Sequence, residues 1–216
     1  MRIPAREHLA ATSPDDPAPF YYQFGLRYPY RKRLRMALKL LGGRSFGRLL
    51  EIGYGSGVFF PELARRCDLL VGVDLHRRAP LVRRMMEREG VRGSLGVANV
   101  HGLPFTAASF DAVVCLSVLE FVEDVAGAVG EISRVLRPGG LAVLGAPVLN
   151  RITGLAYELL IGHIRHDQQH KADHWRILAA AGESLRVLRA ERFPAFLPID
   201  YALFFCVACQ RPGADV

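Results

Sequence analysis

A regular alternation of short apolar runs with longer amphipathic segments is the feature that most constrains the fold of this chain. From Arg48 to Ala146 the apolar runs carry few polar residues, as expected of strands that are covered on both faces of a parallel sheet. The segments between these runs place apolar residues at helical spacing. The pattern predicts an α/β fold with a doubly wound sheet and helices on both of its faces.

The predicted elements fall in short ranges of the sequence. Strands are expected at 48–52, 69–74, 93–98, 110–116, 141–146, 185–192 and 203–210. Helices are expected at 28–41, from the turn after the first strand to about 66, at 80–89, 125–136 and 154–164, and over a segment that ends at 182. Pro138-Gly139-Gly140 should stop the helix at 125–136. The last two strands are joined without a helix, so we expect them to pair antiparallel at one edge of the sheet.

Composition and charge narrow the class of protein. The 216 residues carry a formal net charge of +7, but the basic residues are spread from Arg2 to Arg211, which argues against a nucleic-acid partner. Four scattered cysteines do not make a disulfide scaffold, so we expect a reduced, cytoplasmic protein. The N-terminal residues lack the apolar core of a signal peptide, and the apolar stretch 193–209 is too short to span a bilayer. The basic amphipathic helix at 28–41 leaves peripheral contact with a membrane surface open.

A glycine turn follows the first predicted strand, in the segment Glu51-Ile-Gly-Tyr-Gly-Ser-Gly57. Glycines let the backbone turn tightly and let a ligand approach it closely. The spacing differs from the dinucleotide fingerprint G-x-G-x-x-G, because Val58 stands where the third glycine would be. Asp74 ends the next predicted strand, where a carboxylate can accept hydrogen bonds from both ribose hydroxyls of a nucleoside. Together the turn and Asp74 predict a nucleoside-binding site.

Four ordered segments make the pattern more specific: LLEIGYGSGVF, VGVDL, ANVHGLPFTAASFDAVVCLSVLEFVED and ISRVLRPGGLAVLGAP. With these segments the chain resembles class I S-adenosylmethionine-dependent methyltransferases, in particular the family that includes the quinone-biosynthesis methyltransferases. The resemblance covers roughly 49–147. It implies a Rossmann-like seven-stranded sheet, mostly parallel with an antiparallel last strand. It also implies S-adenosyl-L-methionine as the cofactor and a small molecule as the acceptor.

The resemblance assigns cofactor-binding roles by position. Glu51 and the glycines would cradle the methionine part of the cofactor, Asp74 would bind the ribose hydroxyls, and Leu75 would lie beside the adenine. Leu116 and Ser117 would border the methyl-donor site. The full expected set is Glu51, Gly53, Tyr54, Gly55, Gly57, Asp74, Leu75, Asn99, Val100, Leu116 and Ser117.

Composition and the order of the predicted elements, together with the resemblance, suggest a domain organisation. Residues 1–27 would form an N-terminal arm, whose first 20 residues carry four prolines and are expected to be poorly ordered. Residues 28–212 would form a single methyltransferase domain. It would comprise an N-terminal helix at 28–42, a cofactor-binding core at 47–147, and an acceptor side with the closing strands at 148–212.

Two positions depart from the family pattern. Asn99 stands where the family usually has an aspartate that contacts the adenine amino group; its amide oxygen can still accept a hydrogen bond, but without charge assistance. Phe121 stands where many relatives have a histidine, so that candidate base is absent. The chain also lacks the Asn-Pro-Pro-aromatic motif of amide and nucleobase N-methyltransferases.

A cluster of histidines lies in the last third of the chain: His163, His166, His170 and His174. On one continuous helix they would share a face and could bind a metal. We prefer a polar segment that lines the acceptor pocket, with plain solvated surface as the other alternative, and expect no metal site. His166 and His170 are the candidate general bases.

The sequence therefore predicts S-adenosylmethionine-dependent methyl transfer to oxygen or carbon of a small molecule. The hydrophobic final third would suit an apolar or isoprenoid acceptor. Two alternatives stay open. A non-catalytic, cofactor-binding partner subunit would agree with Asn99 and Phe121, whereas Val58 argues against a nicotinamide-dependent oxidoreductase. No residue pattern indicates the oligomeric state.

Overall fold

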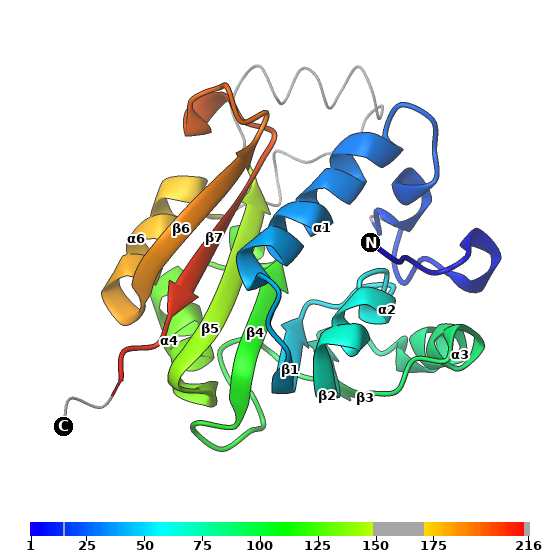
Figure 1. The fold of residues 1–216 in the computed structure, drawn as a ribbon, viewed down its shortest axis with the longest axis horizontal. Coiled ribbons are helices and arrows are strands. Elements are labelled where there is room, and N and C mark those ends of the chain that lie inside the picture. Colours follow the sequence, from blue (N-terminus) through cyan, green and yellow to red (C-terminus); the bar gives the residue numbers. More distant parts are fainter. Residues whose placement is uncertain (15, 149–170, 214–216) are drawn as a thin grey trace.

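The computed structural model describes residues 1–14, 16–148 and 171–213. A seven-stranded sheet lies at the centre of the molecule, with helices on both faces (Figure 1). From one edge to the other, the strands are β3 (Ser94–Val97), β2 (Cys67–Asp74), β1 (Phe46–Ile52), β4 (Phe110–Leu116), β5 (Leu136–Pro147), β7 (Phe204–Gln210) and β6 (Arg186–Phe193). The predicted doubly wound sheet is confirmed.

The direction of the strands follows from their connections. Neighbouring strands from β3 to β5 are parallel, whereas β7 pairs antiparallel with both β5 and β6. The antiparallel last strand is thus confirmed, and it lies between β5 and the edge strand β6. The chain moves outward from β1 to β3 and then returns past β1 to β4. Ligands of such sheets bind where the strand order reverses, outside the carboxyl ends of the strands.

Each face of the sheet is covered by its own group of helices (Figure 1). One face carries α1 (Arg27–Leu41), α2 (Phe60–Leu63) and α3 (Ala79–Glu89), and the other carries α4 (Val125–Val135) and α6 (His174–Ser184). Two separate apolar clusters result, because successive strand residues point to opposite faces. Short 3₁₀ turns complete the chain: η1 (Arg6–His8), η2 (Ala18–Tyr21), η3 (Ala64–Arg66), η4 (Leu119–Phe121) and η5 (Ile199–Tyr201).

Some predicted boundaries were wrong. The helix expected to reach about 66 consists of the single turn of α2 followed by the 3₁₀ turn η3. β5 begins at Leu136, five residues before the strand expected at 141–146, so Pro138-Gly139-Gly140 lies within the strand. The pairing register with β4 shifts at this point, and the irregularity accommodates a proline that a regular ladder would exclude. The helix predicted at 154–164 lies outside the described residues.

The N-terminal arm, predicted to be poorly ordered, packs against the body of the protein instead. The backbone N–H of Arg2 donates to Glu62 Oε2 at 2.6 Å, and that of Ala5 donates to Glu89 Oε1 at 2.7 Å. The ring of His8 is 2.6 Å from the same oxygen of Glu89. Composition could not reveal this arrangement, because the two carboxylates that hold the arm lie on α2 and α3. Within the described residues, no helix has the length and apolarity needed to cross a bilayer.

Candidate cofactor and acceptor site

A cavity of about 1070 Å³ opens at the carboxyl ends of β1, β2 and β4. Its floor is formed by the glycine turn and the residues that follow these strands. The arm and the first half of α1 form the opposite wall. A volume of this size exceeds what one drug-sized ligand needs. The cavity therefore has room for two molecules, side by side.

The glycine turn adopts the backbone conformation that its sequence predicts. Gly53, Gly55 and Gly57 all have positive φ, at +76°, +50° and +75°. A Cβ atom at Gly53 would lie 2.1 Å from Val118 Cγ2, whereas a Cβ at Gly55 would meet no atom within 4 Å. Gly55 is thus the glycine whose missing side chain leaves the backbone open to the cavity. Gly57 is not among the residues that line the cavity.

Asp74 ends β2 and is bound to the glycine turn. Its Oδ2 accepts a hydrogen bond from the backbone N–H of Gly55 at 2.8 Å, and its Oδ1 accepts one from the backbone N–H of His76 at 3.2 Å. The His76 ring Nε2 is 2.9 Å from the carbonyl oxygen of Gly55, and the ring packs edge-on against Tyr54. Sequence reasoning missed His76. The Asp74–His76 pair holds both polar groups of the Gly55 backbone in place.

The remaining residues expected at the cofactor base and ribose lie in the same cavity. Leu75 is 68% exposed and Val100 is buried, and both line the cavity. Asn99 Oδ1 accepts from the backbone N–H of His101 at 3.1 Å and lies 3.2 Å from the His101 ring. The amide oxygen that was expected to accept from adenine is therefore shared with His101, which the sequence prediction did not include.

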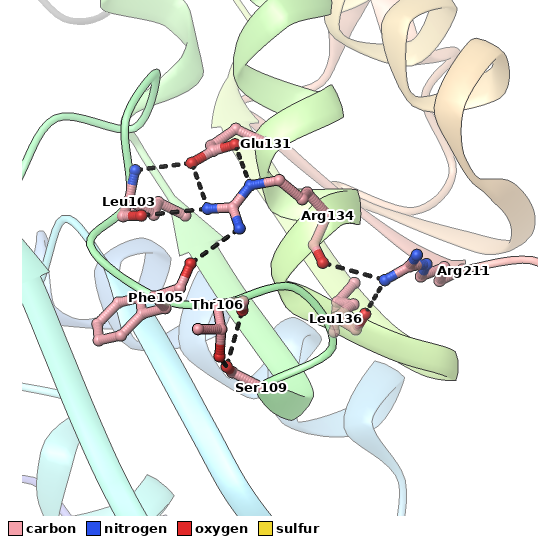
Figure 2. Close-up of polar contacts among 8 residues, drawn as sticks. All are labelled: Leu103, Phe105, Thr106, Ser109, Glu131, Arg134, Leu136 and Arg211. Atoms are coloured by element: carbon pink, nitrogen blue, oxygen red, sulfur yellow. Dashed lines mark hydrogen bonds and ion pairs between the residues drawn. The ribbon is translucent and has the colours of Figure 1, made fainter.

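A polar network on α4 anchors the loop that follows Asn99 and Val100 (Figure 2). Arg134 donates to the carbonyl oxygens of Leu103 and Phe105 at 3.1 and 2.8 Å, and forms a bidentate ion pair with Glu131. Glu131 in turn accepts from the backbone N–H of Leu103 at 2.8 Å. Charge-assisted bonds of this kind fix geometry as well as adding stability. The loop between β3 and β4 is thus attached to α4 through the backbone of Leu103 and Phe105.

Arg33 of α1 crosses the cavity toward the end of β4. Its Nη1 donates to Ser117 Oγ at 3.1 Å, and its Nε donates to the hydroxyl of Tyr21 at 2.9 Å. The guanidinium also lies over the rings of Tyr30 and Phe204, 5.2 and 5.8 Å from their centroids. Among the described residues that line the cavity, Arg33 is the one arginine.

Two buried glutamates face the same space. Glu51 ends β1 next to the glycine turn, and burial and the nearby charge of Asp74 raise its pKa, while Arg33 lowers it. Glu120 lies on η4 and is 2% exposed. Burial raises the pKa of Glu120 to about 8, and smaller opposing effects come from a hydrogen bond with its own backbone and then from Arg33. Sequence reasoning expected Glu51 but gave Glu120 no role.

The candidate bases His166 and His170 lie outside the described residues, as does His163. His174 is described: it is buried at the start of α6, and its Nε2 lies 3.0 Å from Asp200 Oδ1. It does not line the cavity. Within the described ranges, no group of three or more potential ligands could hold a metal ion.

Arg33 and Glu120 are the principal residues that sequence reasoning missed. Arg33 lies on a helix with several other basic residues, and nothing in its local pattern distinguishes it from them. Glu120 carried a signal, since it lies four residues after Leu116, the last residue of β4, which was predicted to border the methyl-donor site, and it is beside an unusual phenylalanine.

Three features of this structure define the class I S-adenosylmethionine-dependent methyltransferases. They are a seven-stranded sheet of this strand order with β7 antiparallel, a glycine turn after β1, and a carboxylate at the end of β2. A structure of the N-methyltransferase NodS from Bradyrhizobium japonicum WM9, in complex with S-adenosyl-L-homocysteine, shares this fold with a TM-score of 0.67 and 22% identity. The match covers 94% of this chain and 95% of that one.

Sequence comparison identifies the family. The family model described as a methyltransferase domain matches residues 50–144. The chain is 31% identical to the ubiquinone biosynthesis O-methyltransferase of Alkalilimnicola ehrlichii over 186 residues, which cover 78% of this chain and 72% of that protein. It is 32% identical to the protein of the same name from Methylocella silvestris over 152 residues, covering 69% of this chain and 59% of that protein. The chain belongs to this methyltransferase family.

Proposed function

We propose that this protein transfers the methyl group of S-adenosylmethionine to a hydroxyl oxygen of a small apolar acceptor, of the phenol or quinol type. The single observation that carries the proposal is the cavity of about 1070 Å³, which adjoins both the cofactor-binding turn and a wall of aromatic side chains. The names of the two ubiquinone-biosynthesis relatives support oxygen as the accepting atom.

The residues at the strand ends fit the cofactor. The backbone of Gly55 faces open space, as a close approach by the ligand requires. Asp74 would bind the ribose hydroxyls and Leu75 would cover the adenine, whose edge would meet Asn99 and Val100. Opening of the contact between Asp74 and the Gly55 N–H would free one carboxylate oxygen for the ribose.

Arg33 is suited to the methionine end of the cofactor. It presents a permanent positive charge above Ser117, and a guanidinium pairs with a carboxylate through two hydrogen bonds in one plane. Tyr21, which accepts from Arg33, fixes the orientation of the side chain. Arg33 thus supplies the countercharge for the cofactor carboxylate, a role that the sequence-based set lacked.

The acceptor half of the cavity is apolar. Its described lining includes Phe20, Tyr30, Phe193, Leu203 and Phe204, which come from the arm, from α1 and from the ends of β6 and β7. Flat rings such as those of phenols and quinols stack favourably on aromatic side chains. Among the described lining residues, those from the expected acceptor side, 148–212, share this wall with residues of the arm and of α1.

The chemistry makes modest demands on the protein. The bound cofactor supplies a methyl group activated by its sulfonium. The side chains of the cavity bind the two molecules, exclude water, and hold the acceptor oxygen near the methyl carbon; orientation of this kind can contribute several kcal/mol, on the order of 7 or more in the best cases. A proton acceptor is needed only because a neutral hydroxyl must lose its proton.

A two-stage experiment tests the proposal. First, S-adenosylhomocysteine should raise the melting temperature of the protein, and nicotinamide dinucleotides should not. Second, the protein should methylate catechol, hydroquinone or a farnesyl-substituted catechol, with the product identified by mass spectrometry. Stabilisation by S-adenosylhomocysteine without methylation of any of these acceptors would refute the proposed acceptor class and favour a non-catalytic, cofactor-binding subunit.

A further inference from the structure

Glu120 is a buried carboxyl group whose side chain forms no hydrogen bond with another described residue. Only 2% of the residue is exposed, and both Oε1 and Oε2 are buried without a partner among the described residues. The side chain lines the cavity. A buried carboxyl group left in this state destabilises a folded protein, since it has lost its hydration and contacts no hydrogen-bonding group beyond its own backbone.

Other acidic residues of this chain show what a structural role looks like. Glu131 accepts from a backbone N–H and binds Arg134, and Glu89 accepts from the backbone of Ala5 and pairs with Arg2. Glu120 lacks contacts of this kind although it is more deeply buried than either. Contacts within the protein therefore do not explain a carboxyl group at this position. Contact with a ligand bound in the cavity would explain it.

The position of Glu120 is fixed by its backbone and not by its side chain. Its carbonyl oxygen accepts from the backbone N–H groups of Lys171 and Ala172, at 2.7 and 3.1 Å. The residue lies on η4, three residues after Ser117, which follows the last residue of β4 and borders the expected methyl-donor site. The carboxyl group is thus held at the boundary between the cofactor half and the acceptor half of the cavity.

The environment of Glu120 gives its carboxyl group a pKa at which it can both accept and release a proton near neutral pH. Burial raises the pKa of Glu120 to about 8, while a hydrogen bond with its own backbone and the charge of Arg33 favour the ionised form. The Cys115 thiol also lies near Glu120, and burial raises the pKa of that thiol. Lys171 and Glu123 pair with each other at the rim of the cavity.

We propose that Glu120 is the catalytic residue that accepts the proton of the acceptor hydroxyl. The inference rests on the proposed function. As the acceptor oxygen forms its bond to the methyl carbon, the carbon–sulfur bond breaks and sulfur keeps the electron pair. The hydroxyl proton passes to the Glu120 carboxylate and leaves to solvent after the product departs. Many relatives have a histidine at the position of Phe121, and in this chain Glu120 would act as the base instead.

Glu120→Gln tests the proposal, because glutamine keeps the shape and removes the proton acceptor. With the farnesyl-substituted catechol as acceptor, kcat should fall about a hundredfold or more, with KM for the catechol little changed. In the wild type, kcat/KM should rise with pH through about 8, and the variant should lose this rise. Glu120→Asp should keep the rise at reduced kcat. Affinity for S-adenosylhomocysteine should stay within about threefold.

Stability provides a readout that does not depend on turnover. The pKa of the Glu120 carboxyl group is higher in the folded state than in the unfolded state. The wild type should therefore lose stability relative to Glu120→Gln as the pH rises from about 4.3 to about 8. At pH 8 the variant should melt at a higher temperature than the wild type. A structural glutamate would give the opposite result. Glu183→Gln, at an exposed position on α6, serves as the control and should change neither property.

The outcomes separate the two proposals. A wild type that methylates the catechol, together with a Glu120→Gln variant that retains more than about a third of its kcat, would overturn the role of Glu120 alone. A variant with a lower melting temperature at pH 8 than the wild type would overturn it as well. A wild type that binds S-adenosylhomocysteine but methylates no phenol would overturn the proposed function, and the role of Glu120 with it.

Discussion

Alanine at Gly55 should mainly weaken binding of the cofactor, whereas alanine at Gly57 in the same turn should mainly lower stability. Gly55 and Gly57 both have positive φ, so alanine at either position costs roughly 1–2 kcal/mol of backbone strain. At Gly55 the added Cβ points into the open cavity. At Gly57 it would lie 2.7 Å from both Met85 Cε and Val82 Cγ1.

The packing around Gly57 sets the size of the difference. The terminal methyl of Met85 can turn aside, but the Cγ1 of Val82 is attached to a short, branched side chain of α3 in the core. Overpacking of this kind costs about 1–3 kcal/mol beyond the strain. Gly57→Ala should therefore lower the free energy of unfolding by roughly 2–5 kcal/mol, and Gly55→Ala by roughly 1–2 kcal/mol.

Urea denaturation and titration calorimetry with S-adenosylhomocysteine measure the two effects. Gly55→Ala should weaken binding at least about tenfold, because its methyl group occupies the space where the ligand meets the backbone. Gly57→Ala should bind within about threefold of the wild type at temperatures where it is folded. Equal losses of stability in the two variants, or normal affinity in Gly55→Ala, would refute this account of the turn.

Three further predictions concern other parts of the site. Asp74→Ala should lower the affinity for S-adenosylhomocysteine, measured by calorimetry, at least about tenfold, since hydrogen bonds to a charged group contribute ~1.5–3 kcal/mol each. A loss below about threefold would show that Asp74 binds the glycine turn but not the ligand. Arg134→Met should lower the free energy of unfolding in urea by about 1–3 kcal/mol through lost bonds to Leu103 and Phe105, and a loss under about 0.5 kcal/mol would contradict this. Hydrogen bonds from the arm lower the pKa of Glu89, so Glu89→Gln should be less stable than the wild type at pH 7. This difference in stability should disappear as the pH falls below about 4.3. A difference that does not change with pH would contradict the prediction.

The glycine turn and Asp74 could be predicted because their roles depend on local structure. The positive φ of Gly53 and the end of β2 at Asp74 each depend on a short segment of the chain. The spacing of the glycines and the end of an apolar run indicate both of them in the sequence. The start of β5 could not be predicted in the same way. Pro138 normally ends a strand, and only the shifted register between β5 and β4 allows it there.

Arg33 and Glu120 show where sequence reasoning stops. Arg33 is one of six basic residues on α1, and its position in the cavity depends on how that helix packs against β7. Glu120 and Glu123 lie three residues apart in SVLEFVED, yet one is buried and the other has an exposed side chain paired with Lys171. Such differences arise from tertiary contacts that no local pattern contains.

The two halves of the cavity come from different parts of the chain, and this division bears on how such a protein can evolve. The cofactor side is built from one stretch, 51–120, that spans four neighbouring strands. The facing wall is assembled from residues 12–34 and 193–204, near the two ends of the sequence. Mutations in these outer segments can reshape the space for the acceptor while the inner stretch is inherited unchanged. Acceptor choice can thus diversify among descendants that keep the same methyl donor.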